Sequence, residues 1–204
     1  MAEAERWLLV TVSTAGAAAS LRVQVWRKLR SLGALYLQQS VCLLPDRPEV
    51  ARAVRRLLDR VRHDGGEARL LHLTLPDPDE QAAVVEEFRR ERAVEYAEVL
   101  ERTPAFLAEL ATERARGRTT YAEVEESEAD LERFRSWLAK IAARDYFDAP
   151  NAAEARAMVD RCAAELAAFE EAALAAEAPD PDATAPAPGG TAVRRLRLAS
   201  TDQP

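Results

Sequence analysis

The chain has 204 residues, of which 48% are hydrophobic and 31% charged, and its formal net charge is −7. This length is enough for one large domain or two small ones with a real core. No apolar run approaches the roughly 20 residues that cross a bilayer. The apolar run at residues 7–12 is shorter than the core of a signal peptide, and Glu3 and Glu5 precede it. Composition therefore argues against a membrane protein and favours a cytoplasmic one.

The charges are distributed unevenly along the chain. Residues 1–76 hold 12 Lys and Arg against 7 Asp and Glu, a net charge of +5. Residues 77–178 hold 13 against 25, a net charge of −12. A basic front joined to an acidic half predicts an anionic partner for the front.

The first 76 residues alternate between strand patterns and helix patterns. Residues 7–12 and 41–44 are continuous apolar runs, typical of strands buried on both faces. Two segments with helical spacing begin near residue 19 and at Pro48, and they end at Gly33 and at Gly65-Gly66. Two further segments alternate as half-buried strands do, with a turn at Gln39-Ser40 before the third strand; they are residues 34–38 and 68–75.

The resulting order βαββαβ predicts an α+β fold, the ferredoxin-like split βαβ module, over residues 1–76. In that arrangement the first and third strands are central, which agrees with their continuous apolar character. The two helices cover one face of the sheet only. The other face therefore needs a cover from elsewhere in the chain or from a partner subunit.

The pattern of residues 77–177 predicts an acidic helical region. Thr103-Pro104 is predicted to restart a helix, Gly117 interrupts the next one, and Asn151 with Glu154 gives a capping pattern for the last. We expect this region to pack on the open face of the sheet, or against itself as an antiparallel α-hairpin. Its negative charge is typical of solvated outer helix faces.

Residues 178–204 differ in composition from the rest of the chain. They are rich in Pro, Ala and Gly and cannot bury a core, so we expect a disordered tail. Arg194, Arg195 and Arg197 near its end are typical of a solvating tail.

The cysteines and histidines give no sign of a chemical centre. Cys42 and Cys162 lie far apart in apolar patterns, which indicates reduced core thiols. His63 and His72 have no metal-ligand spacing with any other residue. No phosphate-binding loop, nucleophile elbow or redox motif is present, so we predict a non-enzymatic protein with no cofactor and no metal.

Several segments together resemble a known family. WLLVTVS, then SLRVQVWRKLRSLGALYLQQSVCLLP, then a helix broken by GG, and later FRSWLAKIAARDYFDAP are similar to the N-terminal domain of the chromate resistance protein ChrB, over roughly residues 6–175. The front module also resembles the C-terminal part of the phenylacetate-responsive repressors (PaaX) and, more distantly, the small CRISPR-adaptation endonucleases.

The resemblance implies a cytoplasmic bacterial protein that acts as a chromate-responsive transcriptional regulator of an efflux operon. Longer family members carry a further C-terminal domain. The alternative is therefore an accessory or protein-interaction module that works with a separate partner of the ChrB C-terminal type. Chromate, DNA and a second copy of the chain are the partners to consider; a membrane is not.

The residues at the end of the first strand test whether the resemblance to the endonucleases extends to their chemistry. Those enzymes hold a divalent metal there with an aspartate, whereas this chain has Thr11-Val12-Ser13-Thr14. Without a carboxylate, metal-assisted phosphodiester chemistry has no evident ligand.

Two groups of residues are the candidate sites. The first consists of cations that lie off the apolar stripes of the two front helices, where they suit a phosphate backbone or a tetrahedral dianion; they are Arg22, Arg27, Lys28, Arg30, Arg52, Arg55 and Arg56. The second is the family-motif run Arg144-Asp145-Tyr146. Trp26 flanks the stripe of the first helix and is predicted to be a core residue, and Gln38 to Ser40 are predicted to form the hairpin turn.

Overall fold

The computed structural model describes residues 5–117 and 120–177. The predicted tail and its arginines lie outside the described residues. The first module contains β1 (Arg6–Ser13), α1 (Ala19–Ser31), β2 (Leu35–Gln38), β3 (Val41–Pro45), α2 (Pro48–His63) and β4 (Glu67–Thr74). The helical half contains α3 (Pro78–Ala115), α4 (Tyr121–Ala142) and α5 (Ala152–Glu177).

The four strands form one antiparallel sheet in the order β2-β3-β1-β4. This order confirms the ferredoxin-like α+β prediction. Strand β1 pairs with both β3 and β4, and Leu9 stands between Leu43 and Leu71 in the register. The central position explains the continuous apolar run in β1, where Trp7, Leu8 and Val10 are fully buried.

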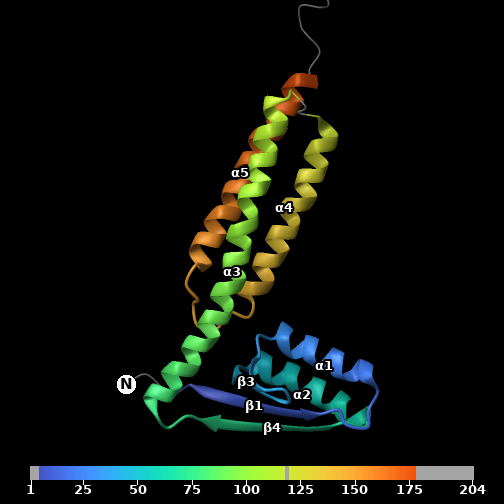
Figure 1. Cartoon of the computed structure of the whole chain (residues 1–204), viewed down its shortest axis with the longest axis vertical. Helices are drawn as coiled ribbons and strands as arrows, with labels where there is room; N and C mark the ends of the chain where they lie inside the picture. Colours follow the sequence, from blue (N-terminus) through green and yellow to red (C-terminus); the bar gives the residue numbers. More distant parts are fainter. Residues whose placement is uncertain (1–4, 118–119, 178–204) are drawn as a thin grey trace, which may run out of the picture.

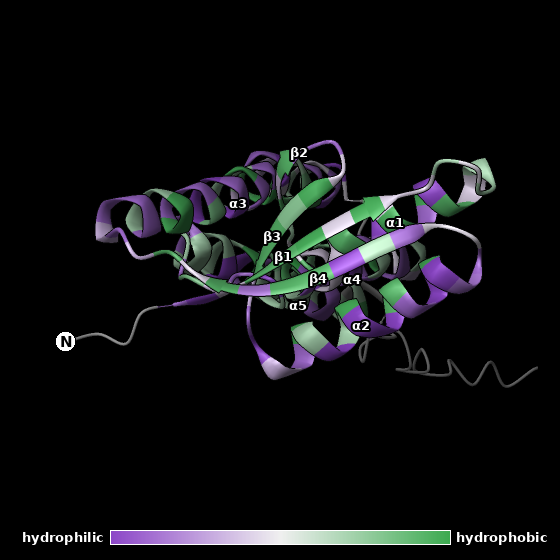
Figure 2. Cartoon of the chain, turned by 90° about the horizontal axis from the view of Figure 1, so that it is seen from below, coloured by the Kyte–Doolittle hydropathy of each residue, from purple (hydrophilic) through white to green (hydrophobic). Residues whose placement is uncertain are grey.

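Helices α1 and α2 cover one face of this sheet (Figure 1). Leu8 and Leu44 from the sheet pack there with Val25 of α1 and with Val54 and Leu58 of α2. Figure 2 shows β3 as hydrophobic along its length, whereas α2 alternates between hydrophobic and hydrophilic residues, as a helix buried on one side should.

The opposite face is covered at one end by the start of α3. Trp7 stacks on Phe88 with ring centroids 5.5 Å apart, and Phe147 closes the same cluster at 5.7 Å from Trp7. The cover is incomplete, because Leu37 and Leu71 remain 47% and 50% exposed. The chain itself thus supplies the expected cover for only part of this face.

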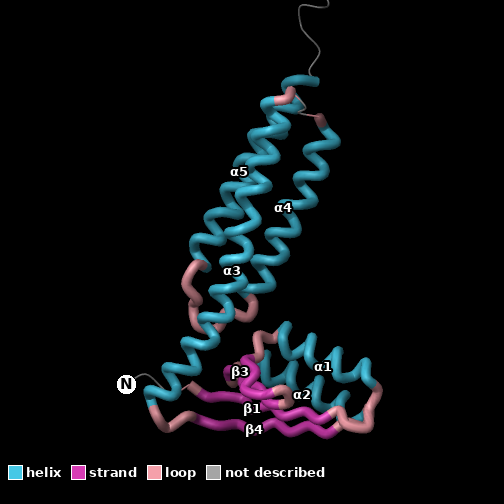
Figure 3. The backbone as a smooth tube through the Cα atoms, in the orientation of Figure 1, coloured by secondary structure: helices cyan, strands magenta, loops and turns pink. Residues whose placement is uncertain are grey.

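The rest of the helical half packs against itself as a three-helix bundle that rises away from the sheet (Figure 3). Helix α3 belongs to both parts, since its first turns lie on the sheet and its later turns form the bundle core with α4 and α5. Among the described residues, no helix combines the length and the apolar character needed to cross a membrane.

One predicted boundary is wrong. Thr103-Pro104 does not restart a helix, because α3 continues through Pro104 to Ala115. Proline has no N–H for the carbonyl of Leu100, four residues earlier. The buried Thr103 hydroxyl donates to that carbonyl at 3.3 Å and to the Val99 carbonyl at 3.1 Å. This side chain, together with the bundle core around it, keeps the helix intact.

Candidate anion-binding groove

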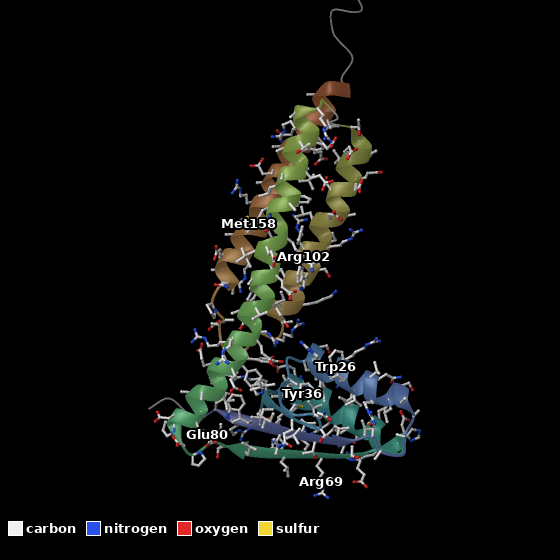
Figure 4. All side chains as sticks on the ribbon, in the orientation of Figure 1. Trp26, Tyr36, Arg69, Glu80, Arg102 and Met158 are labelled. Carbon is white, nitrogen blue, oxygen red and sulfur yellow. The ribbon has the colours of Figure 1, made fainter. Side chains whose placement is uncertain are left out.

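A groove of about 960 Å³ opens between α1 and the tip of the β2–β3 hairpin. Its floor comes from the sheet and from the inner side of α1, and its rim comes from the β1–α1 loop and the hairpin turn. The groove lies at one flank of the helix layer, where the sheet is open beside α1. Figure 4 shows Trp26 on α1 and Tyr36 on the sheet, the two aromatic residues of the groove.

The phase of α1 decides which side chains reach this groove. Leu21, Val25 and Leu29 are buried against the sheet. Arg22 and Trp26, one helical turn apart, therefore share the flank beside the groove, and both line it. Arg30 is one turn further on.

Two contacts hold the cations of this flank in place. The Arg22 Nε donates to the Thr14 hydroxyl at 3.3 Å, which ties the side chain to the β1–α1 loop. The Arg30 guanidinium lies 5.3 Å from the centre of the Trp26 ring, a cation–π contact.

The structure divides the predicted cation set. Arg22 and Arg27 line the groove, and Arg30 contacts its tryptophan. The remaining four are exposed but do not line it; they are Lys28 on α1 and Arg52, Arg55 and Arg56 on α2.

All seven of these cations lack a carboxylate partner among the described residues. Other arginines of the same module do form ion pairs: Arg6 with Asp46, Arg47 with Glu5, Arg60 with Asp64 and Arg62 with Asp59. No ion pair among the described residues therefore neutralises a candidate cation, and Asp59, the acidic neighbour on α2, pairs with Arg62 instead.

The groove floor is uncharged. Burial raises the pKa of the Cys42 thiol to about 12, and burial also raises the pKa of the Tyr36 hydroxyl to about 12. Both groups are protonated near neutral pH, and the raised pKa makes the thiolate of Cys42 rarer than that of an exposed cysteine. Cys42 and Cys162 are both buried and free, as predicted for core thiols.

The second predicted group, Arg144-Asp145-Tyr146, lies away from the groove, where the bundle meets the end of α1. The Tyr146 hydroxyl donates to the Leu32 carbonyl at 2.8 Å, and Arg144 pairs with Glu95 at 2.7 Å. Asp145 accepts from the Ala149 amide at 3.0 Å and from the Tyr96 hydroxyl at 3.2 Å. These contacts hold α1, α3 and the α4–α5 loop together, and we call this region the joint.

A buried arginine completes the joint. Arg92 of α3 is only 5% exposed at its side chain, and it pairs with Glu91 at 3.1 Å and Glu95 at 3.3 Å. Gly33 lies against it with φ +72, and a Cβ at this position would stand 2.9 Å from Arg92 Nη1 and 2.9 Å from Arg144 Cβ. Glycine is required here by backbone conformation and by space.

Sequence reasoning misplaced one groove residue. Trp26 was predicted to lie in the core, but it is 48% exposed. Its one-turn spacing from Arg22 and Arg30 was the signal that could have found it. Gln39 and Ser40 form the predicted turn, whereas Gln38 is the last residue of β2, and all three line the groove. No group of His, Cys, Asp or Glu in the described ranges is placed to hold a metal ion.

Fold and groove together define a class: an α+β protein with a ferredoxin-like module, a helical bundle and a cationic groove. A family model described as Protein ChrB, N-terminal, matches residues 22–179, and the chain belongs to this family. Protein ChrB of Cupriavidus metallidurans is 29% identical over 155 residues, which cover 74% of this chain and 43% of that protein. The chain thus spans less than half the length of this relative. No solved structure is significantly similar to this chain.

Proposed function

We propose that the chain is a chromate-responsive transcriptional regulator of a chromate efflux operon, and that it binds DNA through α1 and α2 without catalysing a reaction. The observation that carries this proposal is the set of seven exposed cations with no carboxylate partner among the described residues. Membership of the ChrB N-terminal family supports the link to chromate.

Only a cation that is not already paired with a carboxylate is fully available to a DNA phosphate. An arginine already paired with a carboxylate gains little from a phosphate, because it must first lose its partner. An exposed, unpaired cation can replace a counterion on the DNA backbone, and release of that counterion favours binding. Chromate, a tetrahedral dianion, is attracted by the same field and can compete for it.

The test is fluorescence anisotropy of a labelled duplex from the region upstream of this gene. The full chain is titrated at several salt concentrations, with chromate or with sulfate as the oxyanion control. We expect salt-sensitive binding that chromate weakens more than sulfate does. Each mutation that removes one cation from a DNA phosphate should lower the salt slope by about 1.

A matched pair of variants separates the unpaired cations from general charge. Arg52→Gln with Arg56→Gln and Arg60→Gln with Arg62→Gln remove the same charge from the same helix. Only the first pair removes unpaired cations, since Arg60 and Arg62 have carboxylate partners. The first pair should weaken DNA binding more; equal losses, or no binding at low salt, would reject the proposal.

A second candidate function is favoured by the sheet face opposite to α1 and α2, because α3 covers only one end of it. Leu37 and Leu71 are exposed there beyond the reach of α3, and apolar side chains on an open face suit a protein contact. The chain would then be an accessory module that joins a second copy or a partner of the ChrB C-terminal type. Light scattering of the full chain, alone and with such a partner, tests this, and Leu37→Lys with Leu71→Lys should abolish any complex.

A further inference from the structure

The groove is larger than an inorganic oxyanion needs. Its volume is about 960 Å³, at the upper end of the ~300–1,000 Å³ of sites that bind organic ligands. A single tetrahedral ion, held by a few donors, fills only a small part of such a space. The groove therefore has room for a ligand larger than one oxyanion.

The walls of the groove are apolar over much of their area. Val25, Leu29 and Tyr36 form part of the floor, and Val23 and Trp26 form the wall on α1. Val23 and Trp26 are 45% and 48% exposed, so both lie open at the mouth. An indole of this kind favours a flat, apolar partner that removes it from water.

The charged side chains that line the groove are all positive. Arg22 and Arg27 line it, whereas no aspartate or glutamate of the described residues does. The Thr14 contact fixes Arg22 at the end of the groove nearest the β1–α1 loop. A ligand that complements this charge carries a negative group, and the guanidinium of Arg22, held beside Thr14, is placed to bind it.

The floor places a further demand on the ligand. Tyr36 and Cys42 are neutral near pH 7 at their ordinary pKa values, and burial raises the pKa of each further, to about 12. A strongly hydrated dianion that moves onto this floor loses its water and finds no opposite charge in return. Burial of an unpaired charge there is therefore costly. The charged end belongs beside the arginines and the apolar end over the floor.

We propose that the groove binds a small organic anion of the aromatic carboxylate class, with its ring against Trp26 and its carboxylate at Arg22. This inference concerns binding by the groove itself and does not depend on DNA binding by the chain.

The test uses 2-naphthoate as the probe and the neutral 2-naphthamide as its matched control, with isothermal titration calorimetry on the full chain and no DNA. We expect saturable, one-site binding of 2-naphthoate and binding at least roughly tenfold weaker of 2-naphthamide, because the amide cannot form the charge-assisted hydrogen bonds of a carboxylate. In ¹H–¹⁵N spectra the indole signal of Trp26 should shift, whereas those of the buried Trp7 and of Trp137 in the bundle should not.

Variants locate the site without disturbing the fold, because the altered side chains are exposed. Arg22→Gln with Arg27→Gln, and separately Trp26→Ala, should each weaken 2-naphthoate binding about tenfold or more. Arg60→Gln with Arg62→Gln removes the same charge from α2, outside the groove and outside the candidate cation set, and should leave binding unchanged. Three results would overturn the proposal: no binding of 2-naphthoate, equal binding of its amide, or full displacement by an equal concentration of sulfate or chromate.

Discussion

Replacement of Gly33 by alanine tests how the first module is joined to the bundle. Gly33 follows α1 with φ +72, and an added Cβ would stand 2.9 Å from both Arg144 Cβ and Arg92 Nη1. The Arg144 carbonyl oxygen would lie 3.2 Å from the same Cβ. The new methyl group thus meets backbone and the first side-chain atom of Arg144, which cannot move without shifting the α4–α5 loop.

The expected cost has two parts. A residue with a Cβ loses about 1–2 kcal/mol in the left-handed region. Overpacking of a tight contact adds about 1–3 kcal/mol. For a chain of this length each kcal/mol lowers Tm by about 2–4 °C. Gly33→Ala should therefore lower the free energy of unfolding by about 2–5 kcal/mol, measured by urea denaturation and by thermal unfolding.

Gly65 supplies the matched control. It also follows a helix, it has φ +84, and a Cβ there would meet nothing within 4 Å. Gly65→Ala should cost only the backbone part, about 1–2 kcal/mol. If the two variants lose equal stability, the close approach of Gly33 to Arg92 and Arg144 contributes nothing, and the joint as described is refuted.

Three further outcomes follow from particular contacts. Thr103→Val removes the hydroxyl that donates to the Val99 and Leu100 carbonyls, and it should lower the free energy of unfolding by about 1–3 kcal/mol in urea denaturation. No change would mean that Thr103 does not support the helix at Pro104. Tyr146→Phe removes the hydrogen bond to the Leu32 carbonyl, and the same assay should show a decrease of about 0.5–1.5 kcal/mol. Burial raises the pKa of the Cys42 thiol from 9.0 to about 12, so between these values the unfolded chain releases a proton that the folded chain keeps. Stability should therefore fall as pH rises above about 9, and Cys42→Ala should flatten that fall; an unchanged slope would contradict the assignment.

The order of elements in the first module was predictable because each signal is local. Continuous apolar runs placed β1 and β3, and glycines placed the ends of α1 and α2. The error at Pro104 has an equally local origin. Proline is a strong helix breaker in isolation, and here the hydroxyl of Thr103 and the packing of the bundle core offset its cost. Tertiary packing therefore overrides the local preference.

The joint was not predictable from the sequence in the same way. Its contacts connect residues far apart, such as Tyr146 with Leu32 and Arg144 with Glu95. The run Arg144-Asp145-Tyr146 stood out by its resemblance to the family, but a pattern of residue types does not say whether they meet a ligand or another helix. In the structure, the polar groups of these side chains bond to the end of α1, to α3 and to the α4–α5 loop.

The distribution of ion pairs separates two uses of arginine in one module. The carboxylates Glu5, Asp46, Asp59 and Asp64 all pair with cations outside the candidate set. A module with a net charge of +5 already carries repulsion among its own cations. Pairing Arg22 or Arg27 as well would have reduced that repulsion. Arg22 and Arg27 stay unpaired on α1, beside an apolar groove without carboxylates among the described residues, so an external anion bound there would lower the electrostatic free energy of this surface.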